Sequence, residues 1–162
     1  MPSPYRFRRA TVRDIPALVR HRVEMHRSMK AVPDRVAALI ASSFRRHLRR
    51  ALTRGEYLGW VAARDGEVVA GAGVVLRPLL PRPSAPRGGR EAYVLNVFTE
   101  PGHRRRGLAC RLVREILSWA RREGAVRVSL HASDQGRPVY EALGFRPTRE
   151  MRIVLKKGRA RG

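Results

Sequence analysis

The most informative stretch of this chain is Val97-Phe98-Thr99-Glu100-Pro101-Gly102-His103-Arg104-Arg105-Arg106-Gly107-Leu108-Ala109. An apolar run over residues 92–98 leads into it, and the Pro101-Gly102 pair indicates a turn. After the turn the sequence has the spacing of a helix with one apolar face, formed by Leu108, Ala109, Leu112, Val113, Ile116, Leu117 and Ala120. The stretch therefore predicts a strand, a basic loop and an amphipathic helix in direct succession.

The loop over residues 104–107 has the chemistry of an anion site. A loop that opens a helix presents free backbone N–H groups and the positive end of the helix dipole, and phosphate commonly binds there. Gly107 lets the backbone approach a ligand without an intervening Cβ. Arg104, Arg105 and Arg106 add forked donors that suit phosphate oxygens. The alternative is a run of surface arginines at an ordinary helix start.

The pattern Arg104-x-x-Gly107-x-Ala109 after a strand resembles the Gln/Arg-x-x-Gly-x-Gly/Ala signature of the GCN5-related N-acetyltransferases. In that family, backbone amides of this loop hold the pyrophosphate of acetyl-CoA. The sequence has neither the Gly-x-Gly-x-x-Gly of a dinucleotide fold nor the Gly-Lys-Ser/Thr of a P-loop. The resemblance implies that acetyl-CoA contacts Val97, Phe98, Thr99, Arg104, Arg105, Arg106, Gly107, Leu108 and Ala109.

A second stretch, residues 130–145, resembles the C-terminal signature of the same family, in which a strand is followed by a short helix and Tyr-x-x-x-Gly-Phe. The resemblance implies that Tyr140 lies near the thioester sulfur and acts as general acid. Ser133 stands where the family often has an asparagine that holds the pantetheine arm, and serine can also donate and accept hydrogen bonds. The alternative for Tyr140 is a core aromatic residue with a satisfied hydroxyl group.

The order of elements agrees with this resemblance along nearly the whole chain. Strands are predicted at residues 7–11, 57–64, 67–76, 92–98, 126–131 and 151–155. Helices are predicted at residues 14–29, from 34 onward, at 108–122 and at 134–143, with a loop at 78–90. The order β-α-α-β-β-β-α-β-α-β predicts a mixed α/β fold, with helices on both faces of a mixed sheet. We expect one N-acetyltransferase domain over residues 1–162, with a core at about 5–156 and a basic tail at 157–162.

The resemblance implies direct transfer of an acetyl group from acetyl-CoA to a primary amine of a small molecule or a protein. In the family a backbone N–H of the strand before the loop binds the oxyanion, and the resemblance places this donor near 97–99. The amine must lose a proton; Glu91 is the candidate base, with Glu24, His21, His26 and His131 as alternatives. Candidate acceptor-site residues are Glu24, Met25, Asn96 and His131. No metal is predicted, because the histidines lack ligand spacing.

The charge of the chain leaves two other functions open. Its net charge is +22, but the charges are spread along the sequence, and only three of its 35 basic residues are lysines. Such a surface attracts polyanionic CoA. An Arg-rich RNA- or ribosome-associated protein is an alternative, although only 6% of the residues are aromatic and no aromatic cluster marks a specific nucleic-acid site. A non-catalytic CoA-binding sensor is the other alternative.

Two further features bear on location and assembly. Cys110 is the only cysteine, which excludes an internal disulfide and predicts a reducing compartment. The first residues contain no apolar run typical of a signal peptide or a membrane span. We therefore expect a cytoplasmic protein without a membrane partner, and the family resemblance allows a homodimer.

Overall fold

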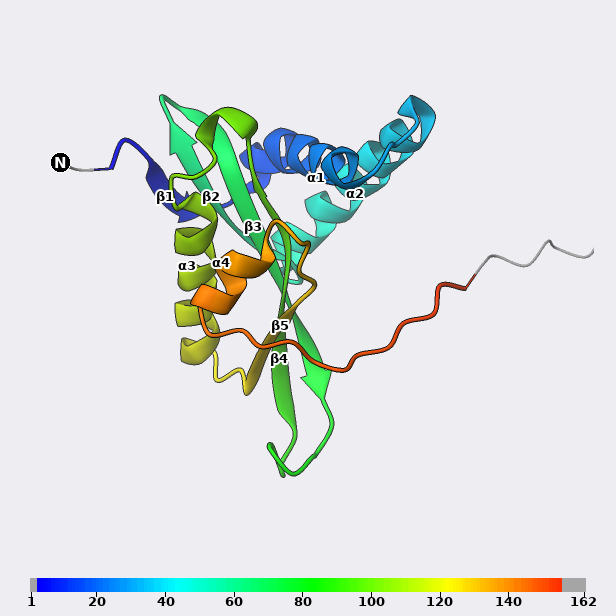
Figure 1. Cartoon of the computed structure of the whole chain (residues 1–162), viewed down its shortest axis with the longest axis vertical. Helices are drawn as coiled ribbons and strands as arrows, with labels where there is room; N and C mark the ends of the chain where they lie inside the picture. The colour runs from blue at the N-terminus through cyan, green and yellow to red at the C-terminus, as the bar shows by residue number, and fades with distance from the viewer. Residues whose placement is uncertain (1–2, 156–162) are drawn as a thin grey trace, which may run out of the picture.

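The computed structural model describes residues 3–155, and its elements follow the predicted order up to the last helix (Figure 1). The strands are β1 (Arg6–Arg9), β2 (Leu58–Arg64), β3 (Glu67–Leu79), β4 (Gly89–Thr99) and β5 (Arg127–Leu130). The helices are α1 (Ile15–Met29), α2 (Asp34–Arg54), α3 (Leu108–Arg122) and α4 (Arg137–Ala142). Short 3-10 turns precede α1 at Val12–Asp14 and follow β4 at Pro101–His103.

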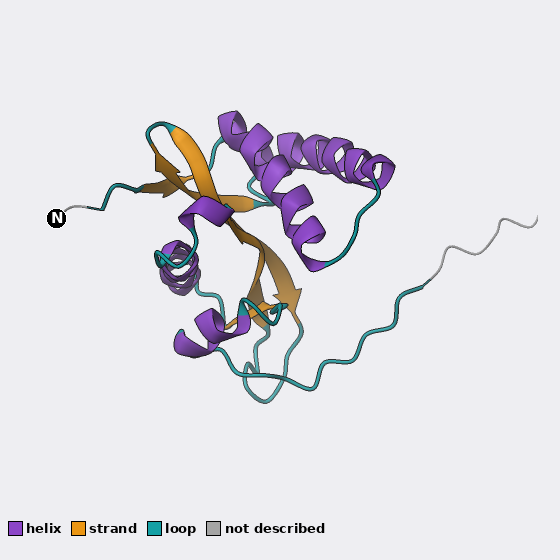
Figure 2. Ribbon diagram, turned by 45° about the horizontal axis from the view of Figure 1, so that its top comes forward, coloured by secondary structure: helices purple, strands orange, loops and turns teal. Residues whose placement is uncertain are grey.

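The five strands form one sheet in the order β1-β2-β3-β4-β5. Neighbouring strands from β1 to β4 run antiparallel, and β4 pairs with β5 in parallel. The helices α3 and α4 lie on one side of the sheet, and α1 and α2 lie on the other (Figures 1 and 2). The predicted mixed α/β fold with helices on both faces is therefore confirmed.

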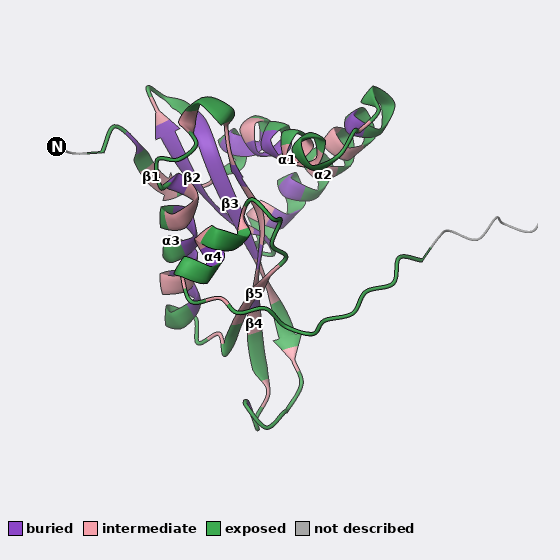
Figure 3. Cartoon of the chain, in the orientation of Figure 1, coloured by how far each residue is buried: buried purple, intermediate pink, exposed green. Residues whose placement is uncertain are grey.

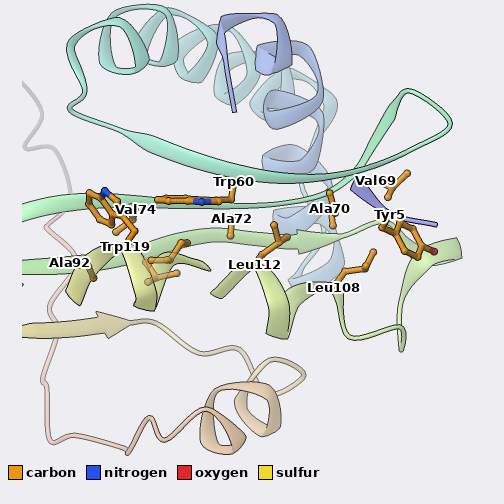
Figure 4. Close-up of a cluster of buried hydrophobic side chains, with 14 residues drawn as sticks. Tyr5, Trp60, Val69, Ala70, Ala72, Val74, Ala92, Leu108, Leu112 and Trp119 are labelled. Carbon is orange, nitrogen blue, oxygen red and sulfur yellow. The ribbon is translucent and has the colours of Figure 1, made fainter. Parts of the chain in front are cut away.

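The face covered by α3 holds the larger hydrophobic core (Figure 4). Leu108, Leu112 and Ile116 project from α3 onto the small residues Ala70 and Ala72 of β3. At the far end of α3 the rings of Trp119 and Trp60 pack with their centroids 5.6 Å apart. This packing fixes α3, and thus the loop that opens it, against the sheet.

The face covered by α1 and α2 has a second core, formed by Ile15, Leu18, Val19, Leu48, Ala51, Tyr57, Val61 and Val68. The apolar residues of α2 are only partly buried. Leu48 is fully buried, whereas Val36 is 44% exposed and Leu39 is 56% exposed. The first turns of α2 extend beyond the sheet, so they have no strand to cover them (Figure 3).

The predicted loop at 78–90 is shorter than expected, because β3 continues to Leu79 and β4 begins at Gly89 (Figure 1). Pro78 lies opposite Arg90 within this extended hairpin. The pairing of β2 with β3 already ends at Leu58↔Val74, so the outer edge of β3 is free at Pro78. A proline fits there, because a free edge requires no N–H donor.

The predicted strand over 151–155 is wrong. This segment forms no strand, and the side chains of Met151, Ile153, Val154 and Leu155 are 82–94% exposed (Figure 3). Alternating apolar residues form a stable strand only when a neighbour takes up their backbone hydrogen bonds, and no described strand does so here. The predicted basic tail at 157–162 lies outside the described residues. No described helix is both long and apolar enough to span a membrane.

Candidate active site

The basic loop before α3 has the backbone of an anion site. Arg105 has a φ of +62° and Gly107 a φ of +76°, and Gly107 is the N-cap of α3. Left-handed residues of this kind arrange successive N–H groups into a concavity for an anion. In the described structure the N–H groups of Arg105, Arg106 and Gly107 donate to no backbone carbonyl, and the four residues from Arg104 are exposed. The loop therefore fits a pyrophosphate.

Three residues of the loop have different surroundings. Arg104 donates from Nε to the carbonyl of Thr99 at 3.1 Å, so this arginine ties the loop to the end of β4. Leu108 is buried in the core under α3 and contributes only its backbone. A Cβ on Gly107 would meet nothing within 4 Å. The glycine is therefore required by its positive φ and by ligand access, and not by crowding within the protein.

The strand β4 contains a β-bulge next to the loop. Gly73 of β3 lies opposite Leu95 and Gly71 opposite Phe98, so Asn96 and Val97 together face one residue of β3. Asn96 accordingly has a φ of +54°. The last pair between β4 and β5 is Val94↔Leu130, just before the bulge. β5 ends at Leu130 while β4 continues to Thr99, so the chains part at this point and the predicted oxyanion donors at 97–99 have no β5 partner.

Tyr140 projects from α4, the helix that follows β5. Its side chain is 9% exposed, and burial raises the pKa of Tyr140 to about 12. Its hydroxyl group has no hydrogen-bond partner within residues 3–155. The hydroxyl is therefore protonated at neutral pH and free to donate a hydrogen bond.

The turn before α4 positions this tyrosine. Ser133 accepts a hydrogen bond at Oγ from the N–H of Gly136 at 3.1 Å. A Cβ on Gly136 would lie 2.9 Å from Cε2 of Tyr140, so the glycine makes room for the ring. Phe145 closes the other side, with its ring centroid 6.0 Å from that of Tyr140. The observed role of Ser133 is thus to shape this turn, and its hydroxyl proton remains available.

A hydrogen-bonded group on the opposite face of the sheet includes the predicted residue Asn96. Its Oδ1 accepts a hydrogen bond from Arg22 on α1, and its Nδ2 donates to the hydroxyl of Tyr57 at 3.4 Å. The guanidinium of Arg22 also lies over the ring of Phe44 on α2, 4.8 Å from its centroid. Sequence reasoning missed Arg22, Tyr57 and Phe44. A signal was present: Arg22 follows the buried Leu18 by four residues, on the apolar face of α1.

Glu91, the predicted base, lies away from this group. It precedes Asn96 by five residues on β4, which is about 17 Å along a strand. Burial opposes the ionisation of Glu91, but hydrogen bonds from Ser129 and Arg127 outweigh burial and hold its pKa below the ordinary value. A paired carboxylate with a lowered pKa is a poor proton acceptor, so this geometry favours a structural role for Glu91.

The other predicted polar residues differ in their surroundings. Glu24 is exposed and pairs with Arg27 at 3.4 Å. His131 directly follows the last paired residue of β5 and contacts Arg152 through Nδ1 at 2.8 Å. Met25 is half-buried on α1. His26 lies one helical turn after Arg22, and its pKa is lowered by burial and by the charges of Arg22 and Lys30.

His21 is more deeply buried than these residues and lies between α1 and the end of β4. Its side chain packs on Phe98, and its Nε2 lies 3.1 Å from Oε1 of Glu100, which also accepts a hydrogen bond from Arg20 at 2.8 Å. Burial lowers the pKa of His21 in spite of the opposing effect of Glu100. A neutral His21 donates from Nε2, and its buried Nδ1 has no partner in the described part of the chain. This residue fastens α1 to the sheet.

Comparisons with known proteins agree with this geometry. The model of the Acetyltransferase (GNAT) family matches residues 23–145. The chain is 30% identical to a GCN5-related N-acetyltransferase from Ralstonia eutropha JMP134, with a TM-score of 0.85 over 93% of this chain and 98% of that one. It is 26% identical to a predicted acetyltransferase from Clostridium acetobutylicum whose crystal structure was determined with acetyl-CoA, with a TM-score of 0.83 over 93% and 96%. A comparison with curated proteins gives no match.

The family match spans the bulge of β4, the loop before α3 and the helix that carries Tyr140, which are the parts that the geometry brings together. The chain belongs to the Acetyltransferase (GNAT) family and is an N-acetyltransferase.

Proposed function

We propose that the protein transfers an acetyl group directly from acetyl-CoA to a primary amine of a small molecule or a protein. One observation carries the proposal. The anion-binding loop, the point where β4 and β5 part, and the buried Tyr140 occur in direct succession along a single β4–α3–β5–α4 unit. This arrangement supports a pyrophosphate at the loop, a pantetheine arm between the strands, and a thioester near Tyr140.

The chemistry needs three groups. The neutral amine nitrogen attacks the thioester carbonyl, so that an N–C bond forms and the carbonyl oxygen gains negative charge. Backbone N–H groups at 97–99, which no longer face β5, would stabilise that oxyanion. When the C–S bond breaks, the leaving thiolate takes a proton from the hydroxyl of Tyr140, and the phenolate regains a proton from water before the next turnover.

His26 is the group that we propose for removal of the proton from the amine, directly or through one water molecule. Because burial and the neighbouring charges of Arg22 and Lys30 lower its pKa, His26 is neutral at physiological pH. It lies on the same face of α1 as Arg22, which contacts the bulge of β4. Glu91 and Glu24 are engaged in ion pairs, which makes them weaker candidates.

A screen for thiol release tests the proposal. Acetyl-CoA is incubated with the protein and a panel of amines, polyamines, aminoglycosides, amino acids and peptides, and free CoA is measured. We expect acetyl transfer to at least one class, and loss of transfer in Tyr140→Phe. If the protein binds acetyl-CoA but releases no CoA with any amine, the non-catalytic CoA-binding sensor becomes the better interpretation.

The remaining expectations stay predictions. We expect residues 1–162 to form one domain, to act in the cytoplasm, and to bind no specific nucleic acid. Nucleic-acid binding through the net charge of +22 should be non-specific and should weaken steeply with salt. A homodimer is compatible with the family. Tight binding of one defined RNA at physiological salt would instead favour the RNA- or ribosome-associated function.

A further inference from the structure

Arg22 is a half-buried cation that has no carboxylate partner among residues 3–155. Its only described hydrogen bond goes to the neutral Oδ1 of Asn96. Burial lowers the pKa of its guanidinium, which shows that the surrounding protein does not fully compensate the charge. An arginine in this situation retains several unused N–H donors next to the β4 bulge.

The neighbouring arginines of α1 are paired, and this contrast is informative. Arg20 contacts Glu100 at 2.8 Å, and Arg27 contacts Asp34 at 2.8 Å. The carboxylates near this side of α1 are therefore already engaged by other cations. In a chain with a net charge of +22, an arginine without an acidic partner is not unusual in itself. The partial burial of Arg22 does require an explanation, because burying an unpaired charge is unfavourable.

The orientation of Arg22 is fixed by Asn96, which is itself held by the buried hydroxyl of Tyr57. The hydroxyl of Tyr57, which is fully buried, accepts from Nδ2 of Asn96, and this bond turns Oδ1 of Asn96 towards Arg22. The guanidinium of Arg22 also lies over the ring of Phe44, with its Cζ 4.8 Å from the ring centroid. A cation whose position is fixed in this way loses little entropy when it binds an anion.

We propose that Arg22 binds an anionic group of the acceptor, a carboxylate or a phosphate, so that the substrates are small amines that carry a negative charge. This inference rests on the proposed acetyl transfer and adds the substrate class. The guanidinium matches both anions with its forked donors. Asn96 links this anion site to the bulge where β4 and β5 part, which is where the amine must reach the thioester.

Matched pairs of amines test the substrate class. One series contains ω-amino acids of increasing chain length, each compared with its carboxamide; a second compares phosphoethanolamine with ethanolamine. The pairs differ in charge and little else, and the two series distinguish carboxylate from phosphate. We expect kcat/KM to favour the charged member of the best pair by about 10- to 100-fold, the value of a charge-assisted hydrogen bond. Equal use of the neutral members would overturn the proposal.

Three variants connect this preference to Arg22. Arg22→Gln keeps a donor for Asn96 and removes the charge, so KM for the charged amine should rise about 10- to 100-fold more than KM for the neutral amine. Comparing the two amines within one variant cancels the effect that Arg22 has on the pKa of His26. Arg22→Lys should restore part of the preference. Arg46→Gln is the matched control, because Arg46 is exposed on α2, and it should behave like the wild type. If Arg22→Gln keeps the wild-type preference, Arg22 is only a packing residue.

A binding measurement separates this proposal from the proposed function. Calorimetry with CoA-loaded protein measures the affinity for the same charged amines without any transfer. Weaker binding to Arg22→Gln than to wild type and Arg46→Gln supports the anion site, even if no amine is acetylated and the proposed function fails. Equal affinity for Arg22→Gln and the wild type, or no binding of any charged amine, overturns the anion site whatever the thiol-release screen shows.

Discussion

The phenol ring of Tyr57 occupies the space above Gly73. A Cβ built on Gly73 would lie 2.0 Å from the hydroxyl oxygen of Tyr57 and 2.3 Å from its Cζ. The absence of a side chain at this position of β3 lets Tyr57 cross the strand and reach Asn96 on β4. The glycine thus connects the packing under α2 to the candidate acceptor site.

Gly73→Ala should displace Tyr57 and break its contact with Asn96. We expect a loss of about 1–3 kcal/mol in the free energy of unfolding, as for other overpacked cores, measured by denaturant titration. Gly102→Ala is the control, because a Cβ there meets nothing within 4 Å. If Gly73→Ala proved as stable as Gly102→Ala, the packing of Tyr57 on β3 would have to be revised.

Gly107→Glu should abolish binding of acetyl-CoA, because it places an anionic side chain at the loop that would receive the pyrophosphate. Gly124→Glu is a closely matched control at the other end of α3, which has 15 residues and is about 22 Å long. Gly124 has a φ of +69° and an equally open Cβ position, so both variants carry similar strain and the same charge. Calorimetry should show lost affinity only at 107; equal affinities would exclude this loop as the phosphate site.

Tyr140→Phe should lower kcat by about a hundredfold or more, with little change in affinity for acetyl-CoA, because only the leaving thiolate needs the hydroxyl proton. The ring packing against Phe145 is retained in this variant. Steady-state kinetics combined with calorimetry separates the two effects. An unchanged kcat would make Tyr140 a packing residue and water the acid.

His26→Asn should lower kcat/KM at neutral pH and change the pH profile. Because the pKa of His26 lies below its ordinary value of 6.5, the proton-accepting form predominates above that pH and is lost as the pH falls through the lowered pKa. The amine substrate also titrates, but its ionisation affects the wild type and the variant equally. The ratio of their kcat/KM values therefore removes this contribution. This ratio should be constant above about pH 6.5 and should decline towards one at lower pH. A ratio near one at every pH would exclude His26 as the base, and His131→Asn would be the next variant to measure.

His21 should make the fold acid-sensitive. Its pKa in the folded protein is depressed below the unfolded value of about 6.5, so the unfolded state binds the proton more readily. The stabilisation is complete above about pH 6.5 and is lost as the pH falls from that value towards the folded-state pKa. We expect Tm to drop over this range, before protonation of carboxylates such as Glu100, whose pKa is held below its ordinary value by Arg20 and His21, and to drop less in His21→Gln. Any pH dependence of Tm that remains in His21→Gln should come from His26. A drop in Tm of the same size in His21→Gln as in the wild type would assign the acid sensitivity to other groups.

The order of the elements up to α4 could be predicted from the sequence alone. The Pro-Gly turn, the basic loop and Gly107 predicted the strand–loop–helix unit, and Gly107 adopts the positive φ that its position requires. The tyrosine of the second motif lies on the expected helix. These features depend on residues close in sequence, for which backbone conformation and apolar periodicity are sufficient.

The group of residues around Asn96 could not be predicted from the sequence. Arg22 lies on α1, Phe44 on α2, Tyr57 just before β2 and Asn96 on β4, and no spacing along the chain relates them. The same limit explains the wrong strand at 151–155, because its apolar alternation has no described strand beside it. Periodicity predicts which face of an element is apolar, but burial, pairing and the pKa of a side chain depend on which elements pack against it.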